Sequence, residues 1–130
     1  MLLSLVATLA RAESVDVVIY GGHAKGNRCG LVAAKGGHSV LLAEPTIRIG
    51  GMTANGLSHP DFSAFEALNR IYWELTQRTL AYYTKAYGAD SQQVKDTFRG
   101  THAEPKVNLL LVQQMHRAPQ DCGAHPVAPA

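Results

Sequence analysis

The sequence predicts an α/β fold in which a strand–helix–strand unit precedes a mainly helical segment. Two short runs rich in branched apolar residues, 15–20 and 39–43, have the composition of buried strands. Glycines interrupt the chain directly after the first run, and a weak helical pattern over 27–36 connects it to the second. Between residues 57 and 98, apolar side chains recur every three to five positions, which predicts helix.

The glycines after the first strand form an altered version of a G-x-G-x-x-G turn. Gly21, Gly22 and Gly26 are in place, while His23 stands at the middle glycine position. Glu44 closes the second predicted strand, 23 residues after Gly21. In a dinucleotide-binding βαβ unit, such a turn presents backbone N–H groups to a pyrophosphate, and an acid at this spacing accepts hydrogen bonds from ribose hydroxyls. The spacing therefore predicts a site for an adenine dinucleotide, in which His23 narrows the room for the pyrophosphate.

A second glycine pair, Gly50-Gly51, follows this acid within the segment 44–53. Together with 17–22 and 37–44, the segment resembles the start of FAD-dependent oxidoreductases of the glutathione-reductase-like Rossmann superfamily, and among them bacterial secreted flavoproteins of the xanthan-lyase-like type. The stretch 99–107 is similar to the same group, so the resemblance covers roughly residues 14–116. It implies FAD as the cofactor and these binding residues: Gly21, Gly22 and Gly26 at the pyrophosphate, Glu44 at the adenosine ribose, and Arg48, Gly50, Gly51 and Met52 along the rest of the cofactor.

The chain departs from the pattern of this family at three places: His23, Lys25 and the Arg28-Cys29-Gly30 cluster. A glycine inside a helix costs about 1 kcal/mol relative to alanine. Arg28 and Cys29 stand at positions where small apolar residues would pack on the sheet, and we expect Cys29 to be buried on this helix. The departures lower the expected affinity for the cofactor and leave the family resemblance in place.

The helical segment has one predicted apolar stripe. Its members share helical spacing and are Phe62, Phe65, Leu68, Tyr72, Leu75 and Leu80. Asp61 or Ser63 would cap the start of this helix, and residues 87–90 would stop it. A second helix is predicted over 107–115, with Pro105 in its first turn.

The chain of 130 residues divides into three predicted parts. Residues 1–12 are largely apolar and end in an A-x-A motif, which predicts a signal peptide and export to the periplasm or the medium. If these residues are not a signal peptide, the expected location of the protein is the cytoplasm. Residues 13–118 would form a partial FAD-binding domain with a helical insert, and residues 119–130 an unstructured tail. Because members of the family that the chain resembles are several times longer, we expect a fragment or truncated product, incomplete relative to the family. A complete small α/β protein is the alternative.

Composition argues against several classes of partner. The net charge of +2 is too small to predict nucleic-acid binding, and the apolar N-terminal run is too short to span a membrane. The six histidines have no metal-ligand spacing, and the two cysteines form no redox or zinc motif. The expected partner is a small-molecule substrate. The sequence predicts no catalytic residue, because the substrate pocket of the family is largely built by sequence outside this chain.

The predicted function is that of the N-terminal cofactor-binding fragment of an FAD-dependent oxidoreductase, with redox chemistry carried by bound flavin. One alternative is a non-catalytic nucleotide-binding module or an inactive truncated remnant. A further alternative is an NAD-dependent dehydrogenase, because Glu44 suits the ribose of either dinucleotide. The Gly50-Gly51 pair after the acid favours FAD over NAD.

Overall fold

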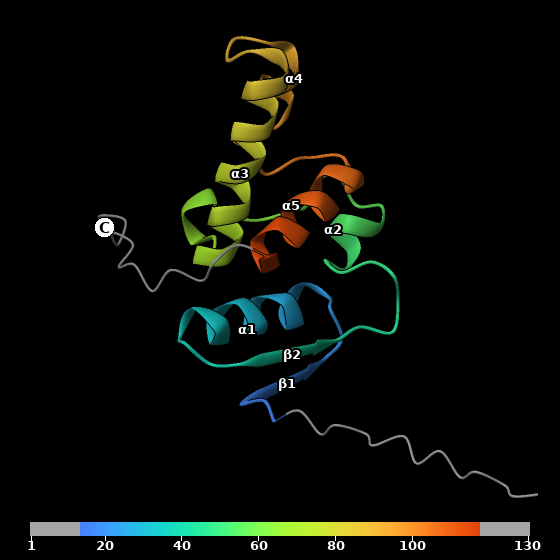
Figure 1. Cartoon of the computed structure of the whole chain (residues 1–130). Coiled ribbons are helices and arrows are strands. Elements are labelled where there is room, and N and C mark those ends of the chain that lie inside the picture. Colours follow the sequence, from blue (N-terminus) through green and yellow to red (C-terminus); the bar gives the residue numbers. More distant parts are fainter. Residues whose placement is uncertain (1–13, 118–130) are drawn as a thin grey trace, which may run out of the picture.

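Figure 1 shows the computed structural model of the chain, which describes residues 14–117. Strand β1 (Val17–Tyr20), helix α1 (Ala24–Lys35) and strand β2 (Val40–Ala43) come first. The strands pair in parallel, with Val17 opposite Val40, and α1 covers one face of this two-stranded sheet. The prediction of a strand–helix–strand unit, and of a mixed α/β fold, is confirmed.

Glycines allow α1 to lie close to the sheet. A Cβ added at Gly30 would lie 3.4 Å from Ile19 Cδ1, so this glycine faces the strands, as does Gly26 one turn earlier. Arg28 and Cys29 are exposed instead. The expectation that they pack on the sheet, with Cys29 buried, is therefore wrong. The reason is the helical period, which places residues four apart on the sheet face and turns the positions between them away from it.

The helical part of the chain follows β2. Its elements are α2 (Met52–Asn55), the 3₁₀ helix η1 (Phe65–Ala67), α3 (Arg70–Tyr87), α4 (Gln92–Asp96) and α5 (Pro105–Arg117). None of the helices within residues 14–117 is long and apolar enough to cross a membrane. The predicted signal peptide (1–12), the predicted tail (119–130) and Cys122 lie outside the described residues.

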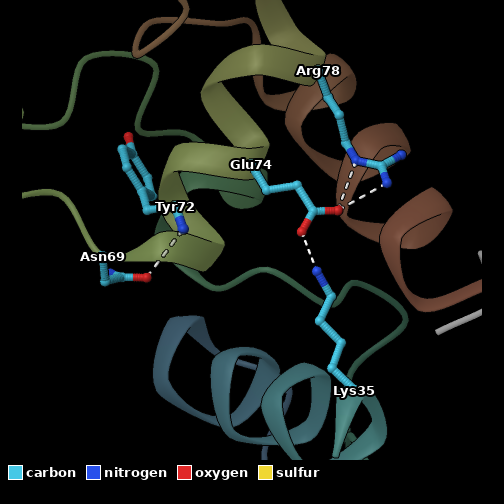
Figure 2. A network of polar contacts seen from close by, with 5 residues as sticks. All are labelled: Lys35, Asn69, Tyr72, Glu74 and Arg78. Carbon is cyan, nitrogen blue, oxygen red and sulfur yellow. Dashed lines mark hydrogen bonds and ion pairs between the residues drawn. The ribbon is translucent and has the colours of Figure 1, made fainter. Parts of the chain in front are cut away.

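The long helix α3 begins later than the sequence predicts. Asn69 is its N-cap, and the Asn69 side chain accepts a hydrogen bond of 3.0 Å from Tyr72 N (Figure 2). A cap at Asp61 or Ser63 is therefore wrong, because residues 57–69 form an irregular loop with one short 3₁₀ helix, and Asn is among the strongest capping residues. The end of α3 at Gly88 and the start of α5 at Pro105 agree with the prediction.

The apolar core is formed by residues of α1, α3 and α5 and the segment just before α5, and Figure 1 shows α5 between α2 and α3, with α1 below them. The buried apolar side chains of this core are Leu31, Leu75, Tyr83, Ala103, Val107, Leu111, Val112 and Met115. Four of them recur on one face of α5 at helical spacing, which explains why this helix is held between α2 and α3.

A polar network joins the sheet unit to the helical part (Figure 2). The Glu74 carboxylate of α3 accepts from Lys35 Nζ at the end of α1, and from Arg78 Nη2 at 2.8 Å and Arg78 Nε at 3.1 Å. Burial opposes ionisation of Glu74, but the hydrogen bonds from Lys35 and Arg78 outweigh it and lower the pKa of this carboxyl. The network therefore favours one docking geometry of α1 on α3.

The sheet face opposite α1 is open among the described residues. Tyr20, Val18 and Leu41 are 79%, 64% and 51% exposed. Parallel sheets are ordinarily covered on both faces, so this apolar face is the least protected part of residues 14–117.

Candidate functional site

The predicted glycine turn joins the end of β1 to the start of α1. Gly21 N donates to Ala43 O at 2.7 Å, which extends the strand pairing by one residue into the turn. A Cβ added at Gly26 would lie 1.9 Å from Gly21 O. Only glycine can therefore occupy position 26 without moving the helix away from the strand, the packing role expected for the last glycine of such a turn.

His23 is the N-cap of α1, and its side chain is exposed. Its Nδ1 accepts from Gly26 N at 3.5 Å, so the ring folds over the turn and covers one backbone N–H. The amides of Ala24 and Lys25 have no hydrogen-bond acceptor within residues 14–117. Two free N–H groups thus remain at the positive end of the 12-residue helix, where an anion is favoured.

The second glycine pair packs against this same helix end. Gly50 N donates to Gly22 O at 2.7 Å. Gly51 has a φ of +63°, and a Cβ added to it would lie 3.1 Å from Ala24 N and 3.2 Å from His23 Cα. The structure therefore brings together two glycine segments that are far apart in the sequence, and Gly51 adds no side-chain atom beside the His23 ring at the start of α1.

Glu44 lies at the edge of this glycine cluster, directly after β2. Its Oε1 accepts from Thr46 N at 2.9 Å, and its Oε2 accepts from Gly22 N. Hydrogen bonds from Thr46, and then from the Gly22 amide, lower the pKa of the Glu44 carboxyl. An ionised carboxylate has about four lone-pair positions, so Glu44 keeps acceptor capacity for hydroxyl groups after these two bonds.

Arg48 and Met52 are less closely placed. Both are exposed, Met52 by 75% at the start of α2. Within residues 14–117, no hydrogen bond or ion pair joins either side chain to the glycine cluster. Six of the eight predicted binding residues thus come together at one helix end, namely Gly21, Gly22, Gly26, Glu44, Gly50 and Gly51, while Arg48 and Met52 are neighbours of the cluster along the chain.

Asn27 supports the cluster and was not singled out by the sequence. It is 5% exposed, and its Nδ2 donates to Gly22 O, the same oxygen that accepts from Gly50 N. Its Oδ1 lies 2.9 Å from His116 Nε2 of α5, so this nitrogen is the donor of the pair. Burial lowers the pKa of His116, which favours the neutral ring. The one available signal was a polar residue among the apolar positions of the predicted helix.

Comparison with known proteins now assigns the family. A family model described as FAD dependent oxidoreductase matches residues 16–125. The chain belongs to the FAD dependent oxidoreductase family. The cofactor of this family is FAD. The search of curated proteins and the search of solved structures gave no match.

The glycine cluster fits the diphosphate of FAD. A Cβ added at Gly51 would lie 3.1 Å from Ala24 N, and glycine leaves that space open, whereas Gly26 allows the Gly21 carbonyl to approach the helix. Two unpaired amides and a helix dipole favour a negatively charged group there, and Glu44 offers acceptor oxygens at the adjacent strand end. Within residues 14–117, no three His, Cys, Asp or Glu side chains gather closely enough to hold a metal ion.

Proposed function

We propose that residues 14–117 form the Rossmann-like cofactor-binding unit of an FAD-dependent oxidoreductase of the glutathione-reductase-like superfamily. The observation that carries this proposal is the contact between the two glycine segments: Gly51 lies against Ala24 N while Gly50 N binds Gly22 O. The arrangement places two unpaired backbone amides at one helix end with an acid beside them, as a dinucleotide requires.

Each predicted binding residue has a role in the proposal. Gly21, Gly22 and Gly26 form the turn around the diphosphate, and the Ala24 and Lys25 amides donate to it. Glu44 accepts from the adenosine ribose. Gly50 and Gly51, with Arg48 and Met52 beside them, line the rest of the cofactor. When bound, FAD supplies the acceptance and donation of electrons, and the chain binds and orients it.

We further propose that the protein is one of the secreted, xanthan-lyase-like flavoproteins. Similarity of 17–22, 37–44 and 49–53 to xanthan-lyase-like secreted flavoproteins supports a place in that group. The A-x-A motif at residues 10–12 supports export of the chain. The substrate is expected to be a small molecule.

Retention of FAD tests the proposal. The purified chain is mixed with FAD and passed through a gel-filtration column, and flavin absorbance is measured in the protein peak. We expect near-stoichiometric flavin with the wild type, and no competition by NAD. A folded chain that elutes without flavin would refute the proposal and favour a non-catalytic module or an inactive remnant.

His23→Gly sharpens this test. Because His23 Nδ1 occupies the Gly26 N–H, its removal frees a third amide for the diphosphate. A hydrogen bond to a charged group contributes about 1.5 kcal/mol or more, which corresponds to roughly tenfold tighter binding. Glycine is itself an acceptable N-cap, so the stability of the helix falls by only about a few tenths of a kcal/mol. An unchanged Kd for FAD, measured by flavin fluorescence titration, would show that His23 does not limit the cofactor.

A further inference from the structure

A cavity of about 110 Å³ lies between the sheet unit and the helical part of the chain. Its walls are mainly apolar and come from three helices, with Leu31 from α1, Ile71 and Leu75 from α3, and Val112 and Met115 from α5. The cavity is partly open to solvent, and its mainly apolar walls favour a small ligand with an apolar body.

The cavity adjoins the glycine cluster. Ala24, the first residue of α1, and Gly50 both contribute to its lining, and Thr53 of α2 follows the second glycine pair. The helix end that we assign to the diphosphate of FAD therefore borders the cavity directly. A molecule bound in the cavity would lie beside the cofactor.

Arg28 supplies a positive charge at this cavity. Ala24, Asn27, Arg28 and Leu31 line it from α1 at the spacing of one helix face. Arg28 is exposed, and no acidic side chain within residues 14–117 forms an ion pair with it. A guanidinium stays charged at every accessible pH and can donate two parallel hydrogen bonds to a carboxylate.

We propose that this cavity is the substrate site and that it takes a small carboxylic acid, with the apolar body in the cavity and the carboxylate on Arg28. The proposal rests on the proposed function, because the cavity gains its meaning from the cofactor at the same helix end. At about 110 Å³ the cavity is smaller than the roughly 150 Å³ that holds benzene, so we expect the apolar body to be a short branched chain. Neutral molecules of equal size lack the partner for Arg28 and bind more weakly.

The test uses 4-methylpentanoate as the probe and its neutral amide as the matched comparison. Binding to the full chain is measured by ligand-observed NMR titration, with FAD absent and again with FAD present. We expect the wild type to bind the acid at least tenfold more tightly than the amide. Arg28→Gln should remove that preference and leave amide binding unchanged, while Lys85→Gln, which removes the same charge far along α3, should leave both unchanged.

A second variant tests the cavity itself. Ile71→Phe fills space from a half-buried position, and it should weaken binding of acid and amide alike by at least tenfold. Val112→Ile adds one methylene from α5 and replaces Ile71→Phe in this test if that variant does not fold. Absence of probe binding to the wild type, or an equal effect of Lys85→Gln and Arg28→Gln, would overturn the inference. Gel filtration of the same samples with FAD separates the two proposals. Retained flavin without probe binding refutes only the substrate site. Probe binding without flavin refutes the cofactor proposal and, with it, the role of the cavity as a substrate site.

Discussion

Gly26→Ala and Gly30→Ala change the same helix by the same methyl group, and the structure predicts effects of opposite sign. At position 26 the new Cβ would lie 1.9 Å from the Gly21 carbonyl oxygen, a backbone atom that no side-chain rotation can move. At position 30 it would lie 3.4 Å from Ile19 Cδ1, an ordinary contact with the end of a side chain.

The magnitudes follow from packing and helix propensity. Relief of the contact at position 26 requires α1 to move away from β1, and overpacking of this kind costs up to about 3 kcal/mol. Alanine in place of glycine returns at most about 1 kcal/mol through helix propensity, so the net loss is about 2 kcal/mol. Gly30→Ala keeps that gain of up to about 1 kcal/mol without the overpacking. The two variants should therefore differ by about 3 kcal/mol in free energy of unfolding.

Urea denaturation followed by far-ultraviolet circular dichroism measures both values. At about 4 °C per kcal/mol for a domain of this size, thermal unfolding should place Gly26→Ala about 8 °C below the wild type and Gly30→Ala up to about 4 °C above it. Equal midpoints for the two variants would refute the packing of α1 on β1 described here. Gly26→Ala should also elute from gel filtration without flavin, because the displaced helix end no longer meets Gly51.

Two further predictions concern titratable groups. Glu74→Gln removes the charge between Lys35 and Arg78 and should lower the free energy of unfolding by about 1–2 kcal/mol. The control is Glu104→Gln, which should change this free energy by less than about 0.5 kcal/mol because the pair of Glu104 with Lys106 is exposed. Equal urea midpoints for the two variants would contradict the role of the network. His102, whose ring centroid lies 4.5 Å from that of His59, has its pKa lowered below 6.5 first by burial and then by the charge of His59, while Asp61 acts in the opposite direction. The unfolded chain therefore takes up this proton first, so stability should fall as the pH drops from about 6.5 towards the lower folded-state pKa and level off beneath it. His102→Gln should flatten this part of the pH–stability curve, and an unchanged slope would show that the ring is not desolvated.

The local elements of this chain follow from short stretches of sequence. The short apolar runs predict both strands, Pro105 predicts the start of α5, and Gly88 predicts the end of α3, because each effect acts within a few residues of backbone. The glycine turn and the acid after β2 also predict the kind of cofactor, since the spacing within one strand–helix–strand unit determines where the backbone amides lie. Where several residues can cap a helix, local information is not enough: Asp61, Ser63 and Asn69 all qualify, and the packing of α3 on α5 selects the last.

Contacts between distant residues are decided only by the tertiary structure. Asn27 meets His116, 89 residues away, and Glu74 meets Lys35, 39 residues away. The exposure of Arg28 and Cys29 likewise depends on which face of α1 meets the sheet, and the cavity beside Arg28 is lined by residues of α1, α3 and α5 that are far apart in the sequence. The sequence determined the strands, the end of α3, the start of α5 and the glycine turn through backbone preferences that act over a few residues. The partners of Asn27 and Glu74, and the exposure of Arg28, depend on how the helices pack, which is an energetic competition among the whole set of side chains and has no local signature.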